Sequence, residues 1–429
     1  MIKKNIYLIG SSVRNPSLKT KYNFLKESEK WSLKKLESYQ LKKLKELLHI
    51  AYHHSEFYKN QFDKFNLDID KVKSLEDLKK FPTIEKIDLI NHSSMVHTNL
   101  KFKKKFLAVT SGTSGQSLKF YRNEESDSFN RAAIQRGYSW YDVNIWEKNG
   151  YFWGFNFSLL KKIKNNILDF LQNRYRIFSY EDKIFKKFVK KSKDSIYIHG
   201  YSSMVYHTAV LINKLKLPKP QRIKMVKGTS EKIFESYQKE IQKAFGVRMI
   251  SEYGATESGL IAFECRHGSM HINMEGVIVE VEDSEILITN LQMKSFPIIR
   301  YKLGDYISLS SRDKKCSCGM NHPILEEVTG RVGVNVYGKL KIYPSFTFYY
   351  IFKNISKTYG IDLIYQVIQN EKGSLIFNIT NKIDINTEQY IKNEIIKYFK
   401  EDMDFCINSN VILKKGKGKL KSFISKVYE

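Results

Sequence analysis

A run of hydroxyl and glycine residues near position 110 has the composition of a phosphate-binding loop. The run consists of Thr110, Ser111, Gly112, Thr113, Ser114 and Gly115. Glycines let the backbone approach a ligand closely, and hydroxyl and backbone N–H groups can together surround phosphate oxygens. The Gly-Lys-Ser/Thr ending and the following helix of a Walker loop are both missing. On its own, this run is as compatible with a flexible hairpin turn as with a phosphate site.

Two later polar segments follow the loop along the chain. Residues 251–257 read Ser-Glu-Tyr-Gly-Ala-Thr-Glu and residues 300–305 read Arg-Tyr-Lys-Leu-Gly-Asp, each after a strand-like stretch. Taken alone, Gly304-Asp305 is most simply a surface turn and Glu257 a solvated charge. Their order after the loop is what makes them informative.

Three of the four cysteines stand near histidines or in a Cys-x-Cys pair. Three thiols and an imidazole suit tetrahedral Zn²⁺ and leave no open position, so the ion would be structural. Buried free thiols are the alternative. Cys406 stands alone and is expected to be a small core residue. The expected zinc ligands are Cys265, His271, Cys316 and Cys318, with His267 and His322 as alternative histidines.

The elements that must position these groups alternate between strands and helices, which indicates an α/β architecture. A helical pattern spans residues 31–58, and Ser74 with Asp77 resembles a capping box for a further helix that ends at Phe81. A helix is also expected over 230–245. Short buried strands are expected at 106–109, 196–198, 247–250 and 285–289. After residue 330 the pattern becomes a compact α+β module, with strands at 365–368, 374–379 and 410–413 and a helix at 387–399.

Composition limits the protein classes. A chain of 429 residues exceeds the usual size of one core, so two or more domains are expected. No apolar run is long enough to span a bilayer, and four cysteines are too few for a disulfide framework, so we expect a cytoplasmic protein. The net charge of +27 invites polyanion binding, but the lysines are dispersed and no nucleic-acid motif concentrates them. Nucleic acid is therefore an unexpected partner, and peripheral membrane association stays open.

In their order along the chain, the three segments resemble the adenylate-forming superfamily, which includes acyl-coenzyme A ligases, adenylation domains and luciferases. Further segments resemble the phenylacetate–coenzyme A ligase-like and CapK-like branch, so the resemblance covers essentially the whole chain. These segments are residues 40–58, Phe81-Pro82-Thr83 ahead of Lys86, His199-Gly200-Tyr201-Ser202, Gly228-Thr229-Ser230-Glu231, and Thr289-Asn290-Leu291 before Pro297.

The resemblance implies an ATP- and acyl-binding N-terminal domain over residues 1–330 and a small mobile C-terminal domain over 331–429. It also implies site roles. The 110–115 loop would hold the β- and γ-phosphates. Tyr253 with Gly254 would contact the adenine, and Thr256 the α-phosphate. Glu257 would hold Mg²⁺. The remaining implied roles fall to Asp305 and Arg331 at the ribose, Tyr201 and Ser202 at the substrate, and Lys419 as the catalytic lysine, with Lys417 and Lys421 as alternatives.

Two departures weaken parts of this reading. Gly115-Gln116-Ser117-Leu118 replaces the usual Gly-x-Pro-Lys of the phosphate loop, so its lysine is absent or displaced to Lys119. Residues 332–335 replace the acidic pair that often follows Gly-Arg, which puts in doubt a standard hinge and a full thioester-forming cycle.

The function implied is an AMP-forming acid ligase. ATP and Mg²⁺ would activate a small carboxylic acid to an acyl-adenylate. The acyl group would then pass to coenzyme A, a carrier protein, or a sugar amine or hydroxyl, with a role in surface polysaccharide synthesis. One rival is a non-catalytic basic protein that uses this fold to bind a membrane surface or polyanion. Another is a phosphate-loop hydrolase, which the missing Walker ending disfavours.

Overall fold

The computed structural model describes residues 2–110, 117–152, 159–177, 182–230, 233, 235–283, 285–328, 335–361, 363, 365–411, 413 and 423–427. The chain divides into two compact units. One unit comprises Met1–Ala108 and Phe120–Gly330, and the other comprises Val109–Lys119 and Arg331–Glu429. Within the described residues, no helix combines the length and the apolar character that crossing a membrane requires.

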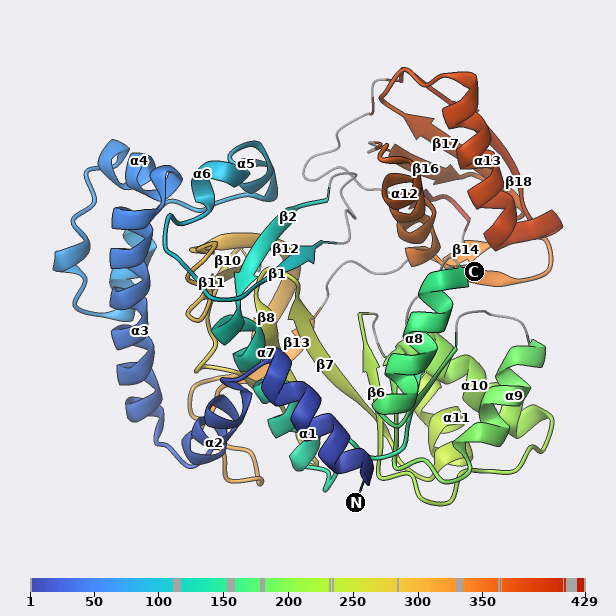
Figure 1. The fold of residues 1–429 in the computed structure, drawn as a ribbon, viewed down its shortest axis with the longest axis horizontal. Helices are drawn as coiled ribbons and strands as arrows, with labels where there is room; N and C mark the ends of the chain where they lie inside the picture. The colour runs from blue at the N-terminus through green and yellow to red at the C-terminus, as the bar shows by residue number, and fades with distance from the viewer. Residues whose placement is uncertain are drawn as a thin grey trace. The chain divides into compact units, whose positions relative to one another are not determined.

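Helices make up the first hundred residues. Their bounds are α1 (Ile2–Arg14), α2 (Leu18–Ser28), α3 (Leu33–His54), α4 (Glu56–Lys64), α5 (Lys86–Asn91) and α6 (Ser93–Val96), with short 3₁₀ turns η1 (Ile69–Lys71) and η2 (Leu75–Lys80) (Figure 1). The helical pattern over 31–58 forms α3 and the start of α4, and Ser55 caps the second of them. The predicted capping box is confirmed, because Asp77 accepts from the backbone N–H of Ser74 at 2.9 Å, although η2 is a 3₁₀ helix.

A mixed sheet forms the centre of the larger unit. The eleven described strands run in the order β10-β11-β12-β13-β9-β8-β7-β6-β5-β3-β4. Strands β4, β3, β5, β6 and β7 are parallel, and the others pair antiparallel. Their bounds are β3 (Asn149–Phe152), β4 (Arg174–Ile177), β5 (Tyr197–Tyr201), β6 (Met225–Thr229), β7 (Met249–Ala255), β8 (Gly259–Glu264), β9 (Met270–Ile272), β10 (Val277–Glu282), β11 (Glu285–Asn290), β12 (Tyr301–Leu309) and β13 (Ile324–Val328).

Helices cover the parallel half of this sheet, as crossover connections require. They are α7 (Glu124–Ser139), α8 (Leu159–Leu171), α9 (Asp182–Ser192), α10 (Ser202–Lys214) and α11 (Glu235–Phe245). A separate hairpin pairs β1 (Lys105–Val109) with β2 (Lys119–Asn123). The predicted α/β class is confirmed. The expectation that 106–109 is a buried strand is wrong, because Leu107 is exposed.

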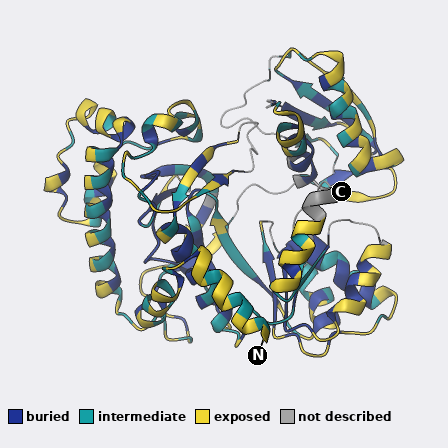
Figure 2. Cartoon of the chain, viewed as in Figure 1, coloured by how far each residue is buried: buried dark blue, intermediate teal, exposed yellow. Residues whose placement is uncertain are grey.

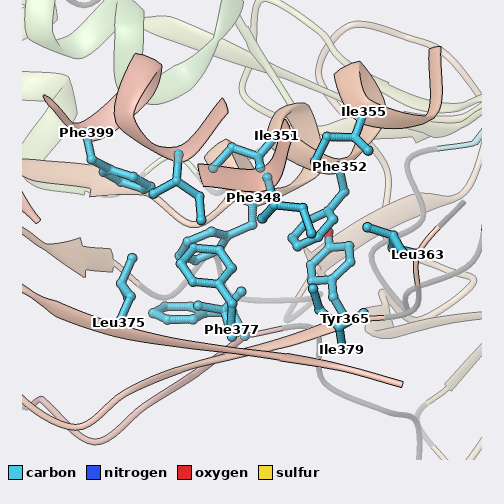
Figure 3. Close-up of a cluster of buried hydrophobic side chains, with 14 of the residues drawn as sticks. Phe348, Ile351, Phe352, Ile355, Leu363, Tyr365, Leu375, Phe377, Ile379 and Phe399 are labelled. Carbon is cyan, nitrogen blue, oxygen red and sulfur yellow. The ribbon is translucent and has the colours of Figure 1, made fainter. Parts of the chain in front are cut away.

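The smaller unit has its own hydrophobic core. Figure 3 shows Phe348, Ile351 and Phe352 of α12, with Phe399 of α13, against Phe377 of the sheet. Its four-stranded sheet has the order β18-β17-β16-β19. The bounds are β14 (Asn335–Tyr337), β15 (Ile342–Pro344), α12 (Phe346–Tyr359), β16 (Tyr365–Gln369), β17 (Ser374–Ile379), α13 (Ile385–Phe399), η3 (Lys400–Asp402), β18 (Asp404–Asn408) and β19 (Phe423–Ser425).

One strand of this unit was predicted in the wrong place. The described residues of 410–413 carry no strand, and the strand that pairs with β17 is β18, five residues in length. In β18 the partly buried Phe405 and Ile407 pack on the core of this unit and alternate with exposed residues, a period of two that is typical of a strand.

Candidate active site and candidate zinc site

The turn between β7 and β8 carries Thr256 and Glu257. The chain reverses there into an antiparallel pair whose register joins Ala255 to Gly259. A Cβ added to Gly254 would lie 2.6 Å from the carbonyl oxygen of Gly259. The Tyr-Gly-Ala-Thr-Glu segment therefore forms a tight hairpin in which the second position needs glycine.

Asn290, at the end of β11, holds this turn from outside the segment. Its buried side-chain amide donates to the carbonyl oxygens of Glu257 and Ser258, both at 3.1 Å. Within the turn, the Ser258 hydroxyl accepts from the backbone N–H of Ala255 at 3.2 Å. Sequence reasoning gave Asn290 no role at the site, and its place in the Thr289-Asn290-Leu291 segment was the available signal.

The carboxylate of Glu257 is buried at this turn. The Tyr301 hydroxyl, from the start of β12, donates to its Oε1 at 3.2 Å. Burying a carboxylate costs free energy unless donors or a cation compensate for lost water. A carboxylate oxygen is also the ligand type that Mg²⁺ prefers, so the chemistry of Glu257 fits the predicted magnesium role.

Tyr253 and Asp305 meet although 52 residues separate them. The Tyr253 hydroxyl donates to Asp305 Oδ2 at 2.8 Å, which joins β7 to β12. Gly304 has a φ of +83°, and glycine adopts this left-handed conformation without strain. The structure thus brings together two of the predicted nucleotide-binding residues.

The structure also places three further residues that were predicted to lie at the site. Thr110 closes the base of the glycine-rich loop, because its hydroxyl accepts from the backbone N–H of Leu118 at 2.9 Å. Tyr201 and Ser202 lie at the junction of β5 and α10, and both are buried. Their predicted contact with substrate stays a prediction.

A row of polar side chains crosses the parallel half of the sheet, and sequence reasoning missed it. The register aligns Arg176 of β4, Tyr151 of β3, His199 of β5 and Lys227 of β6. Buried parallel strands are normally almost wholly apolar. The signal in the sequence was a histidine and a lysine inside strand-like segments that are otherwise apolar.

This row is tied together by stacking and ion pairs. The rings of Tyr151 and His199 stack with centroids 4.5 Å apart. The guanidinium of Arg176 lies 4.9 Å from the Tyr151 ring and pairs with Asp169 at 2.7 Å. At the other end, Lys227 forms an ion pair with Glu252, the residue before Tyr253. The row therefore ends beside the candidate nucleotide residues along the chain.

His199 is the buried centre of this row. Its Nδ1 lies 3.4 Å from the Tyr138 hydroxyl, and its Nε2 has no hydrogen-bond partner among the described residues. Burial lowers the pKa of His199 well below its ordinary value, and the positive charges of Lys227, Arg174 and Arg176 lower it further. The imidazole is therefore neutral near pH 7 and keeps Nε2 available to a polar ligand group.

This pKa shift predicts a pH dependence of stability. An unfolded chain protonates His199 near pH 6.5, whereas the folded protein keeps it neutral, so acid favours unfolding. Between pH 7 and pH 5, the free energy of unfolding measured by urea denaturation should fall by about 2 kcal/mol more in the wild type than in His199→Gln. Equal slopes for the two proteins would contradict a buried neutral imidazole.

The cysteines and one histidine gather in the larger unit. Sγ of Cys265, Nε2 or Nδ1 of His271, and Sγ of Cys316 and Cys318 all lie within 4.8 Å of one another. Cys265 Sγ and Cys316 Sγ are 3.6 Å apart, and Cys318 Sγ lies 3.2 Å from His271 Nε2. Tetrahedral Zn²⁺ with bonds of about 2.0–2.3 Å separates its ligand atoms by about 3.5–3.8 Å, so the donor set fits zinc.

The structure selects among the candidate histidines. His271 of β9 pairs with Ile324 of β13, which places it beside the cysteine loop. Its Nδ1 lies 3.0 Å from the carbonyl oxygen of His322, a contact that orients Nε2 towards the thiols. Burial lowers the pKa of His271 to about 4, so the ring is neutral, as a metal ligand must be. His322 instead faces Glu275 at 3.1 Å.

Comparison with known proteins sets these sites in context. No protein-family model matches the sequence. Protein CapK of Staphylococcus aureus is 22% identical over 389 residues, which cover 83% of this chain and 80% of that protein. Indoleacetate–lysine synthetase of Pseudomonas savastanoi is 34% identical over 99 residues, which cover 22% of this chain and 25% of that enzyme.

Among solved structures, the fold matches 2-hydroxyisobutyryl-CoA ligase over nearly the whole chain. The form with 2-HIB-AMP and CoA in the thioesterification state has a TM-score of 0.62 and 16% sequence identity, and the match covers 93% of this chain and 91% of that one. The postadenylation form with 2-HIB-AMP has a TM-score of 0.59. The chain is thus similar to Protein CapK over most of its length and has the fold of an adenylate-forming ligase. The predicted resemblance to the CapK-like branch is confirmed at the level of sequence similarity and fold.

The structure describes some of the predicted site residues and not others. Tyr253, Gly254, Thr256 and Glu257 share one strand and its turn, and Asp305 joins them through Tyr253. Several predicted residues lie outside the described part of the chain, and their roles stay predictions: Ser111, Gly112, Thr113, Ser114, Gly115, Arg331, Lys419 and its alternatives Lys417 and Lys421.

Proposed function

We propose that this protein activates a carboxylic acid with ATP, forming an acyl-adenylate and releasing pyrophosphate. The observation that carries the proposal is the Tyr253–Asp305 hydrogen bond, which joins two predicted nucleotide residues at the strand whose turn bears Glu257. The matches to CapK and to the ligase fold support it.

In the proposed reaction, a carboxylate oxygen of the acid attacks the α-phosphorus of ATP. The bond from that phosphorus to the bridging oxygen breaks, and pyrophosphate leaves with the electron pair. The Thr256 hydroxyl would donate to an α-phosphate oxygen, where negative charge grows in the transition state. Asn290 and Tyr301 hold the turn and the carboxylate in place for this contact.

Magnesium bound at Glu257 would offset negative charge on the phosphates. The 110–115 loop would surround the β- and γ-phosphates, and Lys419 would neutralise charge between carboxylate and α-phosphate. Asp305 and Arg331 would hold the ribose. Zinc at the Cys265–His271–Cys316–Cys318 cluster would be structural, because four protein donors leave no position for substrate.

A second part of the proposal concerns the compound that accepts the acyl group. Matched ligase structures contain CoA, which favours a thiol acceptor, whereas the partial match to indoleacetate–lysine synthetase favours an amine. A carrier protein or a sugar hydroxyl is the remaining option. Surface polysaccharide synthesis in the cytoplasm is the biological setting that the sequence resemblance implies, which is an argument by association.

The polar row favours an acid that carries a second polar group. Neutral His199 Nε2 is buried without a partner among the described residues, and an unsatisfied buried nitrogen costs about 1–3 kcal/mol. A hydroxyl or a second carboxylate on the acid would satisfy it. Arg174, Arg176 and Lys227 outnumber Asp169 and Glu252 around it, which also favours an electron-rich group.

This substrate class predicts a change in selectivity. His199→Phe retains the aromatic stack on Tyr151 but removes the nitrogen. It should lower kcat/KM for a hydroxylated acid by at least about 10-fold relative to its deoxy analogue. His207→Phe, on helix α10, is the matched control and should leave the ratio unchanged. An unchanged ratio in His199→Phe would remove the polar-acid proposal and leave adenylation itself standing.

Product analysis tests the proposed reaction. Purified protein is incubated with Mg-ATP and each member of a panel of aryl, hydroxy and amino acids, and the nucleotides are separated. AMP and pyrophosphate should appear in equal amounts and only with the correct acid. ADP and orthophosphate would instead indicate a hydrolase.

A further inference from the structure

Helix α1 exposes an apolar stripe although it lies on the surface. Ile2, Ile9 and Val13 recur at helical spacing, and the last two are 66% and 68% exposed. The helix is attached through other positions: Tyr7 accepts a hydrogen bond from Gln135 at 3.0 Å, and Arg14 pairs with Asp127 at 2.9 Å. These anchoring contacts are made by Tyr7 and Arg14 and not by the side chains of the apolar stripe.

Helix α8 also exposes apolar residues. Its exposed residues include Ile163, Ile167 and Phe170, the last two being 56% and 69% exposed. Its acidic residue, Asp169, is instead buried against Arg176. A surface helix normally turns its apolar face to the core, so the exposed apolar residues of α8 depart from the usual arrangement.

The two helices meet where α1 begins and α8 ends (Figure 1). Lys3 Nζ donates to the carbonyl oxygen of Phe170 at 2.7 Å and lies 3.3 Å from the centre of the Phe170 ring. Figure 2 shows long exposed stretches on both α1 and α8. We call the exposed apolar residues of the two helices the α1/α8 surface; they are Ile2, Leu8, Ile9, Val13, Ile163, Ile167, Leu168, Phe170 and Leu171.

The charges of the two helices have one sign. Their basic residues with described side chains are Lys3, Lys4 and Arg14 in α1 and Lys164 in α8. Asp169 is their one acidic residue, and Arg176 neutralises it. Apolar residues flanked by lysines, with no free acid, are the chemistry of a helix that lies in the headgroup region of an anionic bilayer.

We propose that the α1/α8 surface docks this protein peripherally on an anionic membrane. A symmetric dimer would place the same patch against itself and bring the lysines of one copy against those of the other, which disfavours a second copy as the occupant. Nucleic acid would attract the lysines but give the apolar side chains no place to bury. An anionic bilayer satisfies both kinds of group, and the chain's net charge of +27 adds long-range attraction.

Vesicle co-sedimentation tests this proposal independently of enzymatic activity. The full chain should sediment with vesicles of phosphatidylcholine and phosphatidylglycerol at 7:3, remain in solution with phosphatidylcholine alone, and dissociate as salt rises. The double variants Ile9→Glu/Val13→Glu and Ile167→Glu/Phe170→Glu should each weaken binding by at least about 10-fold. Leu340→Glu/Ile385→Glu, at exposed apolar residues of the smaller unit, is the matched control and should bind as the wild type does.

Three results would overturn the proposal. The first is failure of the wild type to sediment with anionic vesicles, or unchanged binding by both double variants. The second is a dimer, detected by light scattering, that both double variants dissociate. The third is a large fall in melting temperature in the double variants, which would mean that the surface is covered within the folded chain. Serine at the same positions, which adds no charge, should give intermediate binding and an unchanged melting temperature.

Discussion

Replacing Glu257 with glutamine is expected to reduce acid-dependent pyrophosphate release by at least about 100-fold, with little change in the KM for the acid. Glutamine preserves the shape of the side chain. Its amide oxygen can still accept a hydrogen bond from the Tyr301 hydroxyl, which in the wild type lies 3.2 Å from the carboxylate oxygen. The substitution therefore removes the negative charge and leaves the turn intact. Stopped assays of pyrophosphate at saturating Mg-ATP measure the effect.

Two further variants separate metal binding from structure at this carboxylate. Tyr301→Phe keeps the charge of Glu257 and removes its hydrogen-bond donor, so it should cost about 10-fold at most. Asp283→Asn alters an exposed carboxylate and should leave the rate unchanged. A Glu257→Gln enzyme with more than half the wild-type rate would contradict the magnesium role, as would an equal loss in Tyr301→Phe.

Replacing Cys316 with serine is expected to remove a bound zinc ion and to lower the free energy of unfolding by about 4 kcal/mol. The cluster joins the end of β8, strand β9 and the loop between β12 and β13, so zinc would tie together three segments of the sheet. Without metal, burial raises the pKa of Cys318 to about 12, so the thiol stays protonated and cannot hold the loop through charge. Elemental analysis and urea denaturation measure the two effects.

Cys406 provides the control for this experiment. It was expected in the core, but it is exposed on β18 and lies outside the cluster. Cys406→Ser should retain about one zinc per chain and the wild-type unfolding curve. The wild-type protein could instead purify without zinc and show the same free energy of unfolding before and after zinc is added. That result would show that the four donors are a cluster of free thiols and a neutral histidine.

The α/β class could be predicted because the alternation of strands with helices is a local pattern that indicates the layers. The hairpin at the end of β7 could not, because it depends on the antiparallel pairing of β7 with β8. The choice of His271 over His267 and His322 could not be predicted, because it follows from the pairing of β9 with β13. Strand pairing joins residues distant in sequence, and local patterns carry no information about it.

The same limit explains the two features that sequence reasoning missed. The polar row exists because the parallel register sets His199 beside Tyr151 and Lys227, although each stands alone in its strand. The apolar stripe of α8 has ordinary helical spacing, which predicts a face turned to the core. The exposure of Ile167 and Phe170 and the burial of Asp169 against Arg176 show that the stripe faces outwards.

Acid-dependent exchange of labelled pyrophosphate into ATP tests the central claim most directly, because exchange requires reversible formation of an acyl-adenylate and needs no acceptor. We predict exchange with Mg-ATP and a polar carboxylic acid, absent without the acid and lost in Glu257→Gln. Absence of exchange across a broad panel of acids, in protein that binds ATP, would contradict the account.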